Sequence, residues 1–403
     1  MHEIAMSSSR LEGFVGLIGA RCWQTRLSEI RALCASGPRA GQANRQRYAV
    51  EMAVARLLRQ PTVAASPTER LLGRIAEDIA DTADTLSPSG RDRLIQLLHE
   101  CLSGSNTLIP VFHLVRTAML QRSRGFEVSF TGLDAQTPYD LLLRRDNIEA
   151  EVACDVFNAE EGRGVHRGAW FRLADRVDPD LQIWLAAHPG RYLLKMTLPL
   201  GLRGALHDPA TDNETLAVLH QRIRAMLEAK TRQDYDEAIV LRLDPLLLAG
   251  AQAEDMGLIS SLRREFGPEA HLSVTTAGNG IFVMAARAGQ ENEVAIAIRR
   301  RLAALAPSRL TGDRPGILAM FVEDTDRTEW RGLRERLELE GEARQFMTNP
   351  EARPVVAVSF ASRLELFDLG EPDAAAEGEI RFRNPGHPAA GVPALAPAVM
   401  SSV

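Results

Sequence analysis

The sequence PYDLLLRRDNIEAEVACDVFNAEEGRG, residues 138–164, decides how the fold is interpreted. It contains two short runs of strand-like alternation separated by a polar turn, which predicts two consecutive β-strands. Alternate residues of a strand point to the same face. In the second run one face is wholly apolar, so we expect it to meet the core; its residues are Ile148, Ala150, Val152, Cys154 and Val156.

The opposite face of the same strand consists of Glu149, Glu151, Ala153 and Asp155. Three like charges spaced about 7 Å apart repel each other on a solvated strand. Asp140 opens the preceding strand and could lie beside them. Because Mg²⁺ prefers oxygen ligands from one or two carboxylates and water, the segment predicts a magnesium site. Its candidate metal ligands are Asp140, Glu149, Glu151 and Asp155.

The surrounding sequence predicts an αβββαβ order of elements. An amphipathic helix ends at Gly125, three strand-like runs follow, a helix is expected at GAWFRLADRV, and residues 191–200 form a strongly apolar strand. This order, together with Asp140 at the start of the second strand, resembles the core of the PD-(D/E)xK nuclease superfamily over residues 105–205. The resemblance implies a restriction-endonuclease-like α/β fold in which a metal holds the scissile phosphate.

The third strand departs from the motif of that superfamily, in which an acidic residue and a lysine lie two positions apart. The pair falls on Ala153 and Asp155, on Glu151 and Ala153, or on Glu149 and Glu151, and no register supplies the lysine. Lys195 is the only lysine in the unit. The resemblance therefore implies Asp140 and Glu151 as catalytic residues, with Lys195 as a relocated lysine; Arg144 or Arg145 could also position the water, although arginine is a poor proton acceptor because it stays charged. The structural alternatives are a turn aspartate, an exposed strand face and a lysine that reaches solvent.

The segment that follows the third strand is rich in arginine. Under the nuclease interpretation, Arg163, Arg167 and Arg172 would contact the backbone of nucleic acid, which positions a protein without specifying sequence. The alternative is a solvated helix face that is partly neutralised by nearby carboxylates. Zinc-ligand spacing, a nucleophile elbow and a phosphate-binding loop are all missing from the sequence.

The sequence as a whole predicts four segments. Residues 1–104 form an Ala- and Arg-rich helical module that packs against a neighbouring domain or a second copy of the chain. Residues 105–205 form the nuclease-like core, and 206–369 form a second α/β unit. The β-α-β-β-α-β order of that unit, with a helix at 252–266, is typical of a ferredoxin-like fold, although the unit could equally extend the first sheet. Residues 370–403 are rich in Pro, Ala and Gly, which predicts a largely disordered tail.

Composition narrows the class of protein. The chain has 403 residues, a net charge of −6 and 45% apolar residues, which is typical of an acidic globular protein. The four cysteines lie far apart, which favours reduced thiols over a disulfide framework. No apolar run approaches the roughly 20 residues that cross a bilayer, and no signal peptide is recognised. We therefore expect a cytoplasmic protein without a membrane partner.

Three functions remain open on sequence alone. The first is a nuclease-like protein with a degenerate motif that binds nucleic acid or a protein partner and cleaves weakly or not at all. The second is an active Mg²⁺-dependent nuclease with a relocated lysine. The third is a non-catalytic adaptor that uses the fold only as a scaffold.

Overall fold

The chain forms two compact units. The six-stranded unit comprises Met1–Glu29, Arg47–Glu161 and Ala295–Val403, and the five-stranded unit comprises Ile30–Gln46 and Gly162–Val294. The computed structural model describes residues 8–60, 64–204, 213–246, 262, 271–367 and 374–402.

The first unit is built on a mixed sheet with the strand order β1-β2-β3-β9-β10-β11. β1, β2 and β3 are antiparallel neighbours, β3, β9 and β10 are parallel, and β11 is antiparallel to β10. The bounds are Glu127–Ser129 (β1), Leu141–Arg145 (β2), Ile148–Asn158 (β3), Gly316–Glu323 (β9), Val355–Ser362 (β10) and Ile380–Arg383 (β11).

The turn between β2 and β3 explains why these two strands form a tight hairpin. Asp146 and Asn147 both have positive φ, 50° and 62°. Two consecutive positive φ values are the requirement of a type I′ turn, whose twist matches that of antiparallel strands. The hairpin sets the register in which Leu142 lies opposite Glu151.

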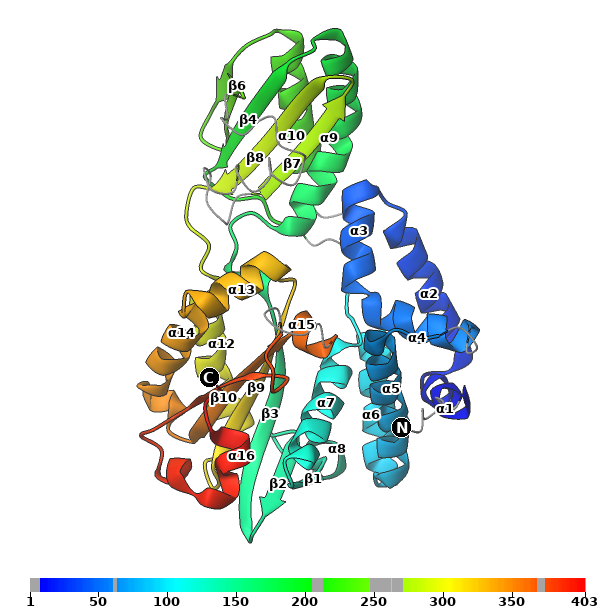
Figure 1. Cartoon of the computed structure of the whole chain (residues 1–403), viewed down its shortest axis with the longest axis vertical. Helices are drawn as coiled ribbons and strands as arrows, with labels where there is room; N and C mark the ends of the chain where they lie inside the picture. Colours follow the sequence, from blue (N-terminus) through cyan, green and yellow to red (C-terminus); the bar gives the residue numbers. More distant parts are fainter. Residues whose placement is uncertain are drawn as a thin grey trace. The chain divides into compact units, whose positions relative to one another are not determined.

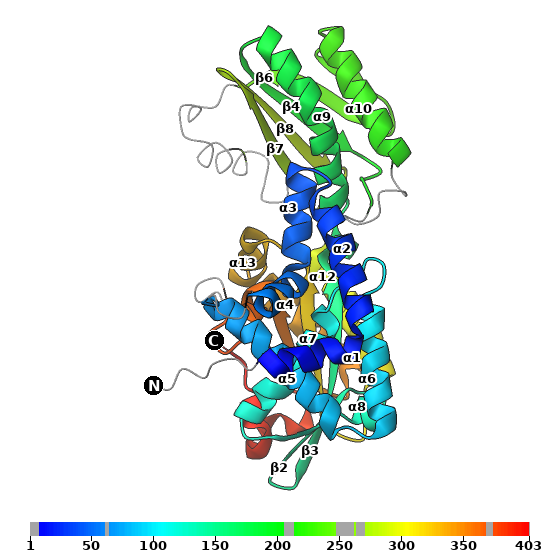
Figure 2. The same cartoon turned by 90° about the vertical axis from the view of Figure 1, so that its right-hand side faces the viewer.

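Helices of the N-terminal region cover one face of this sheet (Figure 2). They pack together with the apolar face of β3, and the core includes Phe14, Ile75, Phe112 and Val152. The expected separate module over 1–104 is therefore corrected: these helices bury their apolar stripes in the same core as the sheet. The helices are α1 (Ser8–Ile18), α4 (Ala49–Arg59), α5 (Pro67–Thr85), α6 (Pro88–Cys101) and α7 (Ile109–Ser123), with the short α8 (Thr131–Ala135) beside α6.

Three helices lie on the other side of the sheet (Figure 1). They are α12 (Val294–Arg309), α13 (Arg327–Glu335) and α14 (Glu338–Met347). Ile298 and Leu302 of α12 are fully buried. The helix also carries arginines toward the polar face of β3, where the candidate site lies.

The second unit is built on a sheet with the order β5-β6-β4-β8-β7. α9 (Arg167–Ala187) and α10 (Asn213–Glu228) cover one of its faces, and the core between them contains Trp170, Leu181, Leu194, Ile223 and Phe282. The strands are Arg191–Leu198 (β4), Gln233–Tyr235 (β5), Val240–Pro245 (β6), His271–Ala277 (β7) and Gly280–Ala288 (β8). Two further helices, α2 (Ala20–Cys34) and α3 (Pro38–Arg47), have residues in both units.

The expected boundaries at 205 and 369 are corrected by these strand pairings. β4 lies between β6 and β8, so it does not join β3. β9 pairs with β3 on one side and with β10 on the other, and neither β9 nor β10 joins β8. Local sequence could not decide this, because β4 and β9 are both short apolar runs and strand pairing depends on long-range contacts. Except for Leu262, the helix expected at 252–266 lies outside the described residues.

The expected disorder of the C-terminal tail is also corrected for 374–402. Leu395, Ala398 and Val399 are buried in the core of the six-stranded unit. Arg381 is 5% exposed and bonds to the main-chain oxygens of Pro397 and Met400. The Pro- and Ala-rich composition did not reveal that a few apolar side chains of this segment pack into the core. The segment contains β11 followed by the short helices η3 (Pro388–Gly391), η4 (Pro393–Leu395) and α16 (Ala396–Val399).

Candidate functional site

Asp140 lies immediately before β2, as predicted. Its Oδ2 atom accepts a hydrogen bond from the main-chain N–H of Cys154 and another from Arg309 Nη2, both at 2.7 Å. Burial raises the pKa of Asp140, while Arg309 and the Cys154 N–H act in the opposite direction. Arg309 is the last residue of α12, so the pair joins that helix to the start of β2.

Glu151 lies in the first half of β3 and is fully buried. Its carboxylate accepts hydrogen bonds from the main-chain N–H of Thr311, at 2.9 Å, and from the Thr311 hydroxyl. Arg314 Nη1 lies 3.6 Å from Glu151 Oε1. The segment that follows α12 therefore occupies the space in front of this carboxylate.

Glu149 and Asp155, at the two ends of the same face, are bound by arginine as well. Glu149 accepts from Arg144 Nε at 2.7 Å and from Arg314 Nε at 2.6 Å. These hydrogen bonds lower the pKa of Glu149. Asp155 accepts two hydrogen bonds from Arg301 of α12, at 2.7 and 2.9 Å, in the bidentate geometry typical of arginine and carboxylate.

We call this set the arginine–carboxylate row. It contains four carboxylates and four guanidinium groups, so it carries no net formal charge. Three of the four arginines come from α12 or from the segment directly after it. The members of the row are Asp140, Glu149, Glu151, Asp155, Arg144, Arg301, Arg309 and Arg314.

The row does not fit the expected magnesium ion. Within the part of the chain that the structure describes, no three His, Cys, Asp or Glu side chains are placed to hold a metal ion together. Mg²⁺ demands octahedral oxygen coordination at 2.0–2.1 Å, and here the carboxylate oxygens already accept from guanidinium or threonine donors. In this arrangement Asp140, Glu149, Glu151 and Asp155 are not placed to share one cation, and α12 supplies positive charge beside two of them.

Lys195 belongs to a different sheet from Asp140 and Glu151. It lies on β4 of the five-stranded unit, and its Nζ is 3.4 Å from Asp244 Oδ2. The catalytic role expected for Lys195 assumed that β4 follows β3 in one sheet. The parallel neighbour of β3 is β9, whose sequence GILAMFVE contains no lysine.

The three arginines expected to contact nucleic acid are less accessible than predicted. Arg163 is only 5% exposed, so its side chain cannot reach a ligand at the surface. Arg167 begins α9 and Arg172 lies near the end of its second turn; both are partly buried. The burial of Arg163 does not fit the contact with nucleic acid that was expected of it, and burial of a single arginine cannot be recognised from an arginine-rich sequence.

A second charged group lies at the carboxyl ends of β3 and β9, and sequence reasoning missed it. Arg47 forms an ion pair with Asp324, which also accepts from Asn158 Nδ2 at 2.7 Å. Glu323 accepts from the Thr107 hydroxyl at 2.8 Å. Burial opposes the charge of Arg47, but Asp324 and Glu323 raise its pKa. The Arg47 pair links the end of α3 to the end of β9, Asn158 links the ends of β3 and β9, and Thr107 links the segment before α7 to β9, which favours a structural role.

Comparison with other proteins does not identify the chain: no family model, curated protein or solved structure matches it. Among the described residues, no helix combines the length and apolar character that crossing a membrane requires. The geometry of the arginine–carboxylate row is therefore the main guide to function.

Proposed function

We propose that the six-stranded unit is a nuclease-like core without cleavage activity and that the protein acts by binding nucleic acid. The order of elements supports the first part. α7, β1, β2, β3, α12 and β9 occur in this order as helix, three strands, helix and strand, with the short α8 between β1 and β2 and residues 162–293 between β3 and α12. Asp140 precedes the second of these strands, as the resemblance requires.

The observation that carries the proposal is that arginine side chains bind the carboxylates that the resemblance assigns to a metal ion. Asp140 and Asp155 are each bound by an arginine of α12, and the Glu151 carboxylate accepts hydrogen bonds from Thr311. A divalent ion placed among four guanidinium groups would be repelled by all of them, and it would have to displace at least one. Arginine cannot take its place as a proton acceptor, since it stays charged.

Partial exposure of the same arginines supports binding to a phosphate backbone. The side chains of Arg144 and Arg301 are 48% and 42% exposed. A guanidinium group has five N–H donors, and Arg301 uses two of them on Asp155. The remaining donors point to a role in contacting phosphate oxygens, which would position nucleic acid without reading its sequence.

The test of the first part is cleavage of plasmid and oligonucleotide with Mg²⁺ or Mn²⁺. Wild type, Asp140→Asn and a control, Asp146→Asn, are compared; Asp146 is an exposed turn residue at positive φ, where asparagine is well tolerated. We expect three identical traces without cleavage. Cleavage by wild type and Asp146→Asn that disappears in Asp140→Asn would contradict the proposal.

The second part is tested by fluorescence anisotropy of a labelled duplex at several salt concentrations. We expect affinity to fall as salt rises, and Arg301→Gln to reduce the slope of log K against log[salt] by about one. Arg331→Gln is the matched control, because Arg331 is also an exposed, ion-paired arginine but lies on α13. If wild type does not bind the duplex even at low salt, the adaptor hypothesis replaces this one.

A further inference from the structure

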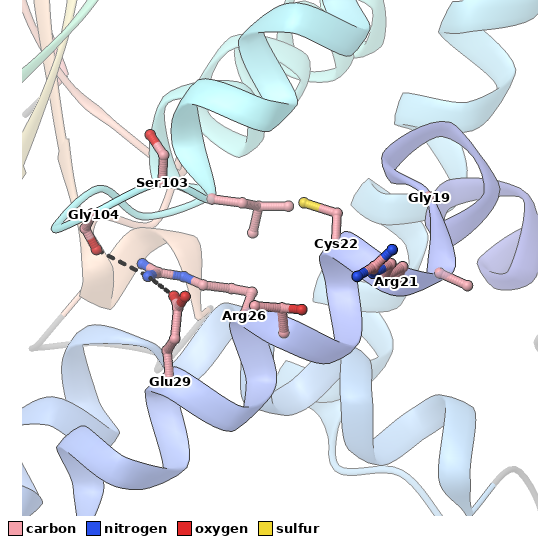
Figure 3. A pocket seen from close by; sticks show the side chains of 10 residues that line it. Gly19, Arg21, Cys22, Arg26, Glu29, Ser103 and Gly104 are labelled. Carbon is pink, nitrogen blue, oxygen red and sulfur yellow. Dashed lines mark hydrogen bonds and ion pairs between the residues drawn. The ribbon is translucent and has the colours of Figure 1, made fainter.

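An open pocket of about 770 Å³ lies in the helical part of the six-stranded unit, away from the row (Figure 3). It is formed by the first three turns of α2 and by residues 102–104, which follow α6. Its volume falls in the range of about 300–1,000 Å³ that is typical of small-molecule sites. Nothing in the proposed function uses this pocket.

Arg26 forms a fixed wall of the pocket. The residue is 2% exposed, and its Nη1 donates to the main-chain oxygen of Gly104 at 2.9 Å and to Glu29 at 3.1 Å. Nη2 donates to the main-chain oxygen of Asn106 at 2.6 Å, and the guanidinium lies 5.0 Å from the centre of the Tyr48 ring. These contacts tie α2 to the segment after α6, so this wall is held in place before any ligand binds.

One buried hydrogen-bond donor of Arg26 has no acceptor among the described residues. This donor is the Nε atom. An unsatisfied donor is costly when buried. Because this nitrogen is buried, it adds to the positive potential of the wall without contacting a ligand itself.

The opposite end of the pocket is positively charged. Arg21 is exposed there, far from Glu29 and Gly104 in Figure 3, and it forms no hydrogen bond or ion pair with any described residue. It belongs to the first turn of α2, a helix of 15 residues that begins after Gly19, where φ is +87°. The amino end of a helix carries a partial positive charge and favours anions. A free guanidinium and a helix amino end thus face one solvent-open cavity.

We propose that this pocket binds a small organic anion. Its phosphate or carboxylate group lies at the first turn of α2 beside Arg21, and its apolar body lies against Leu102. Arg26 positions the wall and does not receive the anion, because its terminal nitrogens are already bound to Glu29, Gly104 and Asn106. Phosphate and carboxylate share the chemistry that the pocket offers, so the experiment separates them.

Cys22 provides a direct reporter, because it is an exposed free thiol that lines the pocket. The full chain is alkylated with N-ethylmaleimide, and modification of Cys22 is followed by peptide mass spectrometry. The probes are phenyl phosphate, phenylacetate and inorganic phosphate, with benzyl alcohol as the neutral control. At four times its dissociation constant, a bound probe slows alkylation about fivefold.

Arg21→Gln is the decisive variant, and Arg31→Gln is its control. Arg31 is an exposed arginine of the same helix that does not line the pocket. Loss of one charge-assisted hydrogen bond weakens binding roughly tenfold. We expect phenyl phosphate or phenylacetate to protect Cys22 in wild type and Arg31→Gln, but not at the same concentration in Arg21→Gln.

Three results would overturn the proposal: no protection by either aromatic anion, equal protection in Arg21→Gln, or equal protection by benzyl alcohol. Whichever anion protects identifies the head group, and inorganic phosphate shows whether the apolar body is needed. Cys101 serves as the internal check of folding. It is 4% exposed, and burial raises the pKa of its thiol to about 12, so it stays unmodified in every folded variant.

Discussion

The two faces of β3 are built in different ways from alternate residues of one strand. On one face Ala150 and Val152 are fully buried among the N-terminal helices. On the other, Glu151 is equally buried but lies against Thr311 and Arg314. On the apolar face, neighbouring side chains need only the right shape and volume to pack. On the charged face, each buried carboxylate oxygen needs a specific hydrogen-bond donor. Burial alone therefore does not distinguish a residue of the apolar core from a residue of a functional site. The chemistry of the groups that contact the residue distinguishes them.

The largest effect is expected on the apolar face, at Phe321. This residue of β9 is 1% exposed, is paired with Val156 of β3, and lies 5.6 Å from His113, measured between ring centres. Phe321→Ala would leave a cavity and lower the free energy of unfolding by about 3–5 kcal/mol. The measurement is urea denaturation. Met52→Ala, at an exposed apolar residue of α4, is the control and should change stability by less than about 1 kcal/mol.

A loss as large as that of Phe321→Ala in the Met52 variant would contradict this account. It would mean that the helices, and not the sheet face, determine the measured transition.

His113 of α7 packs in the core on this side of the sheet and predicts a pH effect of about 3 kcal/mol. The histidine is 3% exposed, its Nε2 lies 2.9 Å from the main-chain oxygen of Ala319, and burial lowers its pKa to about 4. Between pH 6.5 and pH 4 the unfolded chain binds a proton that the folded chain does not. Stability is therefore lost as the pH falls through this window, by about 1.4 kcal/mol per pH unit.

His113→Gln keeps an N–H donor but removes the titration. We expect its free energy of unfolding, plotted against pH from 4 to 6.5, to be flatter than that of wild type by the slope of one proton. Other groups with shifted pKa values titrate in both proteins and cancel in the difference. Parallel curves would show that His113 is protonated in the folded chain as readily as in the unfolded chain. Water would then reach the apolar face more easily than its burial suggests.

On the charged face the expected effect is smaller, and it depends on burial. Glu151→Ala removes the acceptor of both Thr311 hydrogen bonds and should cost about 2 kcal/mol. Glu149→Ala, two residues away on the same face, should cost less, since Glu149 is partly exposed and its arginines can turn to water. Urea denaturation of both variants measures the difference. Equal losses would mean that the row acts as a single coupled network.

The contrast between the faces also explains what the sequence could predict. Alternation in NIEAEVACDV correctly predicted which residues of β3 enter the core, and PYD correctly placed Asp140 before β2. The strand beside β3 could not be predicted, because Gly316 of β9 is separated from it by the whole five-stranded unit. Three of the four arginines of the row, Arg301, Arg309 and Arg314, were missed for the same reason. RRRLAALAPSRLTGDR contains them, but arginine is common throughout this chain, and only the packing of α12 on β3 gives Arg301 and Arg309 their partners.

The smallest effect on stability, and the sharpest test of the charged face, is expected when arginines are removed from α12. Arg309→Gln and Arg301→Gln break partly exposed ion pairs, each of which contributes about 1 kcal/mol or less.

The effect of the same two substitutions on metal binding should be larger than their effect on stability. The charge of Asp155 raises the pKa of Asp140, and the double variant leaves both carboxylates without their guanidinium partners. We expect wild type to bind no Mn²⁺ there and the double variant to bind it with a dissociation constant of about 1 mM or below, as followed by electron paramagnetic resonance of the free ion. Equal binding by both proteins would show that the arginines do not exclude the cation, and the charged face of β3 would then be an open metal site after all. Adding Asp140→Asn to the double variant places the ion, because Mn²⁺ bound between Asp140 and Asp155 must be lost with that carboxylate.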